Sequence, residues 1–184
     1  LPPLHRQPTF CCLIDTSFGP VLVFIVIAIP NIRFRRAYHG RPGEAHLACF
    51  PMVPYCNRIA RGHFAFQGRN IALTPNFPSE VNTIHGMGWQ APWQVTKKTV
   101  NELHLGYDHD AAAGAASGWP WTFRATQTFK LTEDELVIIL QVTNTSTQPM
   151  PAGLGLHPFF PAPEQTFLTS QFSHILQVDD HRIT

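Results

Sequence analysis

No stretch of 12 residues in this chain shows convincing helical periodicity, and this restricts the fold more than any other feature of the sequence. The 184 residues include 17 Pro and 14 Phe. Proline interrupts helices and central strands, whereas aromatic residues are enriched in strands. The sequence therefore predicts short strands joined by frequent turns, in a chain whose length is typical of one domain.

The clearest strand signal is a pair of runs between residues 122 and 142. In Thr122–Leu131 the apolar side chains alternate, as on a strand with one buried face. Leu136–Val142 is apolar on both faces, as expected at the centre of a sheet, and the polar residues 132–135 favour a hairpin between the runs. With the alternating segments Trp93–Thr96 and Leu103–Leu105, these runs predict an all-β fold, an antiparallel β-sandwich.

The first 45 residues differ in their sequence pattern from the rest of the chain. We predict an atypical N-terminal segment at residues 1–45 and a partial sandwich domain at residues 46–184. The first segment contains the apolar run Val21–Ile29. A membrane-spanning helix needs about 20 such residues, and no small-residue cleavage site of a signal peptide follows. We interpret the run as a buried strand rich in β-branched residues, and we expect no membrane contact.

Composition argues against several classes of function. A formal net charge of +1 is unfavourable for a protein that binds nucleic acid.

The four cysteines form no Cys-x-x-Cys pair, and the His and Asp residues at 104–110 lack the spacing of a metal site. We expect no metal, four reduced thiols and a cytoplasmic location. Glycine motifs that bind phosphate are absent, as is the Gly-x-Ser-x-Gly motif of hydrolases.

His157 is the first candidate for chemistry. Histidine suits proton transfer near neutral pH, because its ordinary pKa is about 6.5. His157 lies in the sequence GLGLHPFF, where glycines allow close approach of the backbone and Pro158 restricts it. A rigid histidine among aromatic residues suits a general acid or a sugar-binding group. The alternative is a packed, hydrogen-bonded histidine of the core.

Two further segments contain polar residues between apolar stretches. His85 lies in the sequence IHGMGW, which is consistent with a loop that lines a cavity and equally with a structural turn. Asn57 and Arg58 follow PYC and precede Ile59, so they can reach inward to a ligand. The alternative for Arg58 is an arginine at the end of a strand.

Taken together, these segments resemble the aldose 1-epimerase (galactose mutarotase) family in order and spacing. The resemblance covers about residues 48–163, and its motifs are Ala48–Pro51, Pro54–Phe64, Phe66-x-Gly68, Leu73-x-x-Asn76, Ile84–Gly86, Gly118–Pro120, Met150–Pro151 and Gly155–Phe160. It implies a large antiparallel sandwich of the mutarotase-like supersandwich type. Such a protein binds a free hexose, for example galactose, and interconverts its α and β anomers without a cofactor.

The resemblance also implies roles for individual residues. His157 is the general acid that protonates the ring oxygen of the sugar. His85 and Arg58 bind and polarise the sugar oxygens, with Asn57 beside them. Trp119 stacks on the apolar face of the sugar.

The chain departs from the family pattern in its catalytic base. In the family the base is a glutamate near the C-terminus, and none of the acidic residues after His157, which are Glu164, Asp179 and Asp180, lies in a similar setting. We therefore expect an incomplete sandwich that binds sugar weakly and interconverts anomers slowly or not at all. Unpaired sheet edges would favour self-association.

Two other functions compete with this interpretation. The first is a non-catalytic carbohydrate-binding module, which keeps the cleft without the proton relay. The second is an epimerase of hexose phosphates, which needs a cluster of cationic residues for the phosphate. Only Arg58, Arg61 and Arg69 lie in the relevant stretch, so this function ranks third.

Overall fold

The computed structural model describes residues 10–16, 20–27, 49–78, 80–113 and 117–159, together with Asp179 and Ile183, and for the first two segments it describes the backbone only. These residues form strands and one short 3-10 turn, and no α-helix occurs among them. The strands are β1 (Phe10–Thr16), β2 (Pro20–Ile27), β3 (Cys49–Met52), β4 (Arg58–Ile59), β5 (His63–Phe66), β6 (Arg69–Ala72), β7 (Thr83–Ile84), β8 (Gln94–Lys98), β9 (Glu102–His109), β10 (Phe123–Leu131), β11 (Leu136–Asn144) and β12 (Met150–Pro158), and the turn η1 is Ala60–Gly62.

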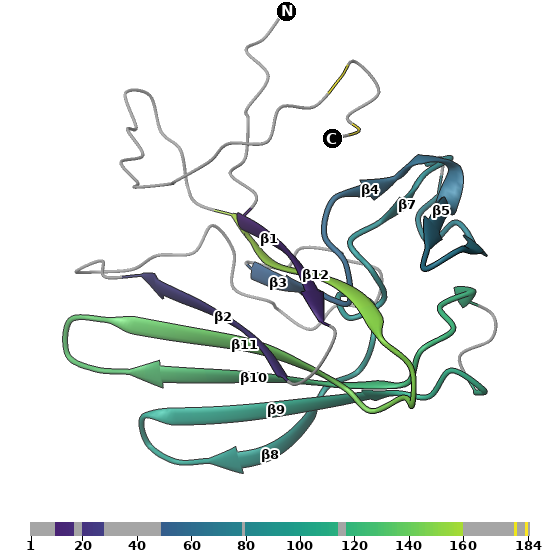
Figure 1. Cartoon of the computed structure of the whole chain (residues 1–184). Coiled ribbons are helices and arrows are strands. Elements are labelled where there is room, and N and C mark those ends of the chain that lie inside the picture. The colour runs from purple at the N-terminus through teal and green to yellow at the C-terminus, as the bar shows by residue number, and fades with distance from the viewer. Residues whose placement is uncertain are drawn as a thin grey trace, which may run out of the picture.

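Two antiparallel sheets form the body of the fold (Figure 1). The larger sheet has the strand order β2-β11-β10-β9-β8, and the smaller sheet has the order β1-β12-β3. Two short ladders, β4-β7 and β5-β6, lie beside one end of these sheets (Figure 1). The predicted all-β antiparallel sandwich is confirmed.

The predicted hairpin is also confirmed. β10 pairs with β11 from Phe123 opposite Asn144 to Leu131 opposite Leu136. On its other side β11 pairs with β2, where Val137 lies opposite Val26. β11 is therefore a central strand, as its apolar character on both faces predicts.

The apolar run near the N-terminus is a strand over Pro20–Ile27, as predicted. β2 pairs with β11, and β1 pairs with β12. The backbone of both early strands thus lies in the same two sheets as the later strands. The division of the chain at residue 45 remains a prediction.

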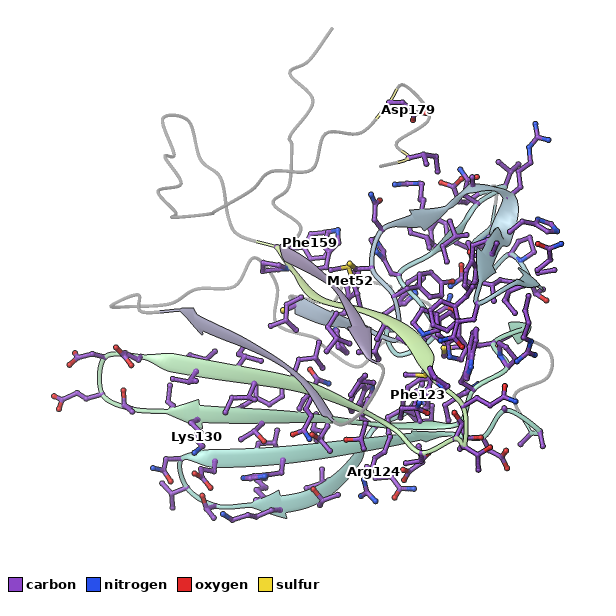
Figure 2. All side chains as sticks on the ribbon, in the orientation of Figure 1. Met52, Phe123, Arg124, Lys130, Phe159 and Asp179 are labelled. Atoms are coloured by element: carbon purple, nitrogen blue, oxygen red, sulfur yellow. The ribbon has the colours of Figure 1, made fainter. Side chains whose placement is uncertain are left out.

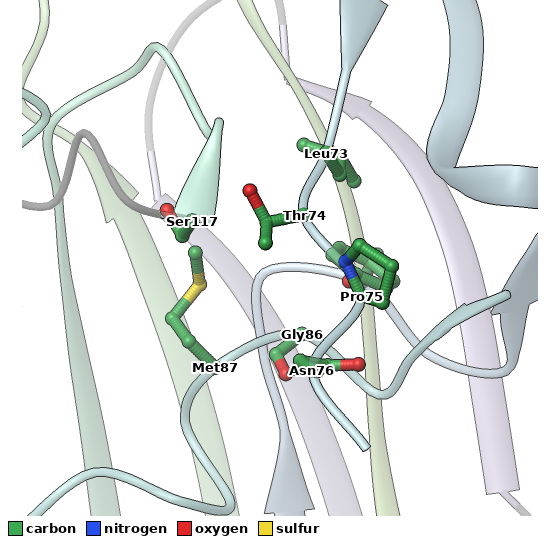
Figure 3. A pocket seen from close by; sticks show the side chains of 8 residues that line it. Leu73, Thr74, Pro75, Asn76, Gly86, Met87 and Ser117 are labelled. Atoms are coloured by element: carbon green, nitrogen blue, oxygen red, sulfur yellow. Dashed lines mark hydrogen bonds between the residues drawn. The ribbon is translucent and has the colours of Figure 1, made fainter. Parts of the chain in front are cut away.

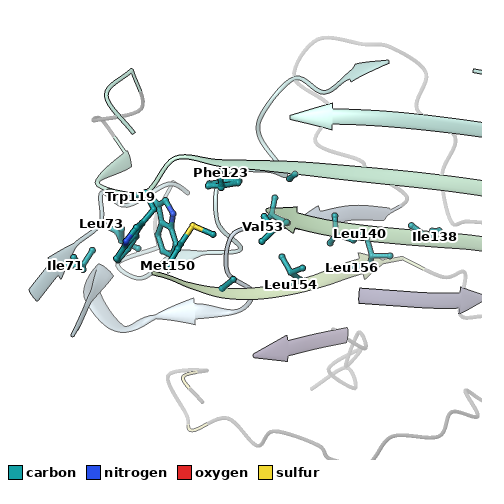
Figure 4. Close-up of a cluster of buried hydrophobic side chains, with 14 residues drawn as sticks. Val53, Ile71, Leu73, Trp119, Phe123, Ile138, Leu140, Met150, Leu154 and Leu156 are labelled. Atoms are coloured by element: carbon teal, nitrogen blue, oxygen red, sulfur yellow. The ribbon is translucent and has the colours of Figure 1, made fainter. Parts of the chain in front are cut away.

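The hydrophobic core lies between the two sheets. Alternation along β10 and β11 buries Phe123, Ala125, Ile138, Leu140 and Val142. Figure 4 shows the Leu154 and Leu156 side chains of β12 opposite Ile138 and Leu140. Complete burial of each large apolar side chain stabilises the fold by about 1.5–3 kcal/mol, so this layer holds β12 and its neighbours in place.

The outer strand of the larger sheet is polar and exposed. All five residues of β8 are exposed, and β8 has no neighbour on its outer edge among the described strands. Figure 2 shows Arg124 and Lys130 on this sheet, whereas Met52 and Phe159 lie by the smaller one. Self-association through sheet edges remains a prediction.

One prediction about the cysteines is wrong. Cys56 is disulfide-bonded, whereas we expected four reduced thiols. Cys49 is free, and burial raises the pKa of its thiol to about 12. In the described part of the chain, no helix has the length and apolar character that a membrane crossing requires.

Candidate active site

The smaller sheet positions His157. Its ladder places His157 of β12 opposite Phe50 of β3, so both side chains point to the same face. The imidazole stacks on Phe50 with a centroid distance of 4.7 Å and on Phe159 with a centroid distance of 4.8 Å. Nδ1 of His157 is buried and has no hydrogen-bond partner among the described residues. Nε2 is therefore the nitrogen that remains to meet a ligand.

His85 belongs to the same cluster of rings. Its centroid lies 5.4 Å from that of His157 and 5.8 Å from that of Phe50. His85 follows β7 and has a φ of 60°, and Asn57 has a φ of 61°. Residues other than glycine seldom adopt this left-handed conformation, and asparagine and histidine are among those that do so most often. Conformations of this kind cluster at functional sites.

Reciprocal hydrogen bonds join His85 to Asn57. The Asn57 backbone N–H donates to Nδ1 of His85 at 3.2 Å, and the His85 backbone N–H donates to the Asn57 carbonyl at 3.0 Å. Because Nδ1 accepts, the neutral imidazole carries its proton on Nε2. His85 therefore offers a ligand one N–H donor in a fixed orientation.

Side chains from outside the turn hold the backbone on both sides of His85. Asn76 donates to the carbonyls of Ile84 and Gly86 at 2.7 and 2.8 Å, and its side-chain oxygen accepts from the Ile84 N–H at 2.9 Å. Trp89 Nε1 donates to the same two carbonyls at 3.3 and 3.1 Å. Our sequence reasoning missed both roles, although the motif Leu73-x-x-Asn76 contained the signal for Asn76.

Arg58 lies next to His85 because β4 pairs with β7, with Arg58 opposite Ile84. Its Nε donates to Oε2 of Glu80 at 2.8 Å. The two side chains are 15% and 21% exposed, so the ion pair is largely shielded from water. The sequence analysis found Arg58 but missed Glu80, which is 22 residues away and carries no motif of its own.

Burial disfavours the protonated forms of both imidazoles. It lowers the pKa of His85 to about 3, and the positive charge of Arg58, together with that of His157 when it is protonated, contributes to the same shift. Burial also lowers the pKa of His157 below its ordinary value. At pH 7 the His85 ring is therefore neutral, and burial disfavours the protonated form of His157.

The structure brings together Asn57, Arg58, His85 and His157, but Trp119 lies elsewhere. Trp119 is 2% exposed and belongs to the main hydrophobic core. It packs against Trp121 and Tyr55, with centroid distances of 5.1 and 5.6 Å. A ring enclosed in this way is not available to stack on a sugar, so the expected role of Trp119 is not supported.

A small cavity of about 220 Å³ lies beside the turn that follows His85, and Gly86 and Met87 are part of its lining. Figure 3 shows Leu73–Asn76 on one side of it, with Met87 and Ser117 on the other. Neither His85 nor His157 lines this cavity. It is therefore distinct from the ring cluster. The described ranges between residues 49 and 159 contain no group of three or more His, Cys, Asp or Glu residues arranged to hold a metal ion.

Fold and site together define an antiparallel β-sandwich protein in which two imidazoles lie beside an arginine. A family model described as Aldose 1-epimerase matches residues 32–184. The chain therefore belongs to the aldose 1-epimerase family.

Curated proteins and a solved structure resemble the chain. It is 36% identical over 138 residues to the uncharacterised protein YphB of Escherichia coli K12, covering 72% of this chain and 45% of YphB. It is 28% identical over 109 residues to the aldose 1-epimerase of the same organism, covering 58% of this chain and 30% of that protein. The solved structure of a candidate aldose 1-epimerase from Escherichia coli K12 superposes with a TM-score of 0.58 at 38% identity, covering 64% of this chain and 38% of the other. The chain thus spans less than half the length of these relatives.

Proposed function

We propose that the chain binds a free hexose at His157, His85, Arg58 and Asn57 and takes part in the interconversion of its anomers. The observation that carries this proposal is the contact between the two imidazoles, whose centroids are 5.4 Å apart. Membership of the aldose 1-epimerase family supports the reaction class. The aromatic rings around His157 offer apolar surface, and His85 offers a donor whose tautomer is fixed by Asn57.

In the proposed reaction His157 acts as the general acid. Protonated His157 gives the Nε2 proton to the ring oxygen while a base takes the proton of the anomeric hydroxyl. The bond between C1 and the ring oxygen breaks and its electron pair stays on that oxygen, so C1 becomes an aldehyde. Rotation about the C1–C2 bond and reversal of these transfers close the ring on the other face. A lowered pKa makes protonated His157 a stronger acid, although less of it is present at pH 7.

Arg58 and His85 serve as donors to sugar oxygens in this proposal. Both groups are held before a ligand arrives, Arg58 by Glu80 and His85 by Asn57. Donors fixed in advance lose little entropy on binding. A neutral His85 can donate to an oxygen without introducing a second positive charge beside Arg58.

We also propose that the isolated chain interconverts anomers slowly. The reaction needs a second proton-transfer group across the sugar from the acid. Glu80, which contacts Arg58, is a poor base, because hydrogen bonds from Arg58 and Asn82 lower the pKa of its carboxyl.

Two measurements on the same preparation test these proposals. Calorimetry should detect binding of glucose or galactose that weakens in H157Q and not in H104Q, because His104 faces Glu102 and Thr128 on the larger sheet. Polarimetry on freshly dissolved α-glucose or α-galactose should detect a slow rate that disappears in H157Q.

Each outcome has a defined meaning. Sugar binding with no catalysed rate would favour the non-catalytic carbohydrate-binding module. A rate at the level of ordinary enzymes that H157Q abolishes would support His157 as the acid and overturn the proposal of slow turnover. No sugar binding by either measurement would overturn the proposed function.

A further inference from the structure

We infer that Glu80 is a positioning residue, which orients Arg58 so that its terminal Nη groups face the sugar. This inference rests on the proposed function for the identity of the ligand. The contacts of Arg58 and Glu80 in the structure support it independently of any sugar.

The first contact divides the donors of Arg58 into two sets. Nε–H donates to Glu80 Oε2 at 2.8 Å. An arginine side chain has five N–H donors, one on Nε and four on the two Nη atoms. The Nη atoms have no hydrogen-bond partner within the described ranges, and they are not among the buried polar atoms that lack one. The bond to Glu80 therefore uses the inner donor and leaves the outer four accessible.

The second set of contacts holds the Glu80 carboxylate itself. Its other oxygen, Oε1, accepts from the backbone N–H and the side-chain Nδ2 of Asn82 at 3.2 and 3.1 Å. Asn82 is buried, and its Oδ1 accepts from the backbone N–H of Arg61 at 2.9 Å. Glu80 is thus tied directly to the backbone before β7 and, through Asn82, to the backbone after β4, which restrains the carboxylate that holds Arg58.

The charge of the pair has a consequence for the neighbouring imidazole. Arg58 lies opposite Ile84, the residue before His85, and its positive charge contributes to the lowered pKa of His85. Hydrogen bonding to Arg58 is the largest cause of the lowered pKa of Glu80, so the carboxylate remains charged at neutral pH. Because the carboxylate holds the guanidinium in place, Arg58 has less side-chain conformational entropy to lose when it binds an oxygen.

A double-mutant cycle tests whether Glu80 acts through Arg58. E80Q removes the charge with little change of size, and we expect it to raise the hexose Kd about tenfold, as for loss of one charge-assisted hydrogen bond. In an R58A background the same change should alter the Kd less than about twofold, because the group it orients is gone. The matched control is E102Q, which removes an equivalent ion-paired carboxylate from β9 and should leave the Kd unchanged.

The alternative is that Glu80 only stabilises the fold. E80Q would then weaken binding equally in both backgrounds, or would lower the melting temperature without changing the Kd, and either result overturns the inference. If E80Q does not fold, E80D shortens the carboxylate by one methylene and the cycle is measured with that variant.

A nuclear magnetic resonance measurement separates failure of this inference from failure of the proposed function. In the ¹⁵N-labelled full chain, the Arg58 Nε–H resonance should be shifted and protected from exchange, and it should move in E80Q but not in E102Q. If no hexose binds and this pattern is present, the proposed function fails while the orientation of Arg58 by Glu80 is retained. An Arg58 resonance that is the same in wild type and E80Q overturns the inference.

Discussion

Gly86 lies directly against the carbonyl group of Val53, so that a methyl group added to its Cα would overlap both Val53 and the nitrogen of Pro54. Gly86 has a φ of 66°, in the region that disfavours side chains. The Val53 carbonyl also accepts from the backbone N–H groups of Met87 and Gly88 at 3.0 and 3.1 Å. The turn that follows His85 is thus packed onto the backbone just after β3, which carries Phe50.

Substitution of Gly86 should test how far this contact holds the site together. We expect G86A to destabilise the fold by about 3–5 kcal/mol, because it adds both backbone strain and overlap with a backbone carbonyl. G68A is a matched control, since Gly68 has a φ of 75° but open space around its Cα. It should lose only about 1 kcal/mol through strain. Urea unfolding measures the free energy of unfolding of both variants. Equal losses would show that the contact with Val53 adds nothing to the stability of the fold.

His85 should make stability depend on pH. Unfolded His85 takes up a proton near pH 6.5, whereas the folded residue does so only near pH 3. Between these values the unfolded state binds more protons, so stability is full above about pH 6.5 and falls as the pH decreases, by at most about 1.4 kcal/mol per pH unit for this one group. H85N keeps an acceptor for the Asn57 N–H and removes the titration. Its urea midpoint should fall less steeply between pH 7 and pH 4.5 than that of wild type.

H63N is the control for the pH experiment. His63 is exposed and lies in β5, away from the ring cluster. The urea midpoint of H63N should therefore change between pH 7 and pH 4.5 by as much as that of wild type. If the urea midpoint of H85N falls with decreasing pH as steeply as that of wild type, His85 is not the source of this pH dependence.

Phe50 should control the pKa of His157. Stacking against Phe50 removes water from the imidazole and so disfavours its charged form. We expect F50L to raise the pKa of His157 toward its ordinary value, because a leucine covers less of the ring. Proton resonances of the imidazole rings followed against pH measure this change.

F123L is the control for F50L, because Phe123 stacks on a different histidine. It stacks on His109 at a centroid distance of 5.0 Å, and burial lowers the pKa of His109 as well. F123L should therefore change the titration of His109 and not that of His157. If F50L leaves His157 unchanged, its lowered pKa has another source.

The two tryptophans Trp119 and Trp89 should differ in their effect on sugar binding. Nε1 of Trp119 is buried without a partner among the described residues, so W119F loses packing but no hydrogen bond. We expect a loss of about 1–2 kcal/mol in stability and no change in the hexose Kd. W89F removes the donor to Ile84 and Gly86 and should weaken hexose binding measurably. Calorimetry and urea unfolding of both variants test this prediction. A stronger effect of W119F than of W89F on the hexose Kd would show that Trp119 belongs to the binding site.

Much of the sheet could be predicted from sequence, because the alternation of apolar side chains along a strand is a local signal. The runs Thr122–Leu131 and Leu136–Val142 predicted β10 and β11, including the central place of β11. The run Val21–Ile29 predicted β2. Apart from the hairpin of β10 and β11, the pairing of strands was not predictable in this way, because the pattern along β12 or β3 does not show which strand lies opposite it.

The candidate site was likewise predictable only in part. His157, His85, Arg58 and Asn57 were found through short motifs, and the structure brings them together. Phe50, Glu80 and Asn76 were missed as site residues, because each acts on a residue far from it in the chain. Trp119 was assigned to the wrong surroundings, since a tryptophan beside glycine and proline has the same local pattern in a core as in a binding site.

The strand-forming segments, the antiparallel sandwich and the candidate histidines and arginine of the site could be predicted from the residues alone. It took the packing of the sheets and loops to show that Phe50 covers His157, that Asn57 sets the tautomer of His85, and that Glu80 holds Arg58. Strand formation depends on neighbours in the chain, whereas burial, pKa and orientation depend on groups that become neighbours only when the sheets pack.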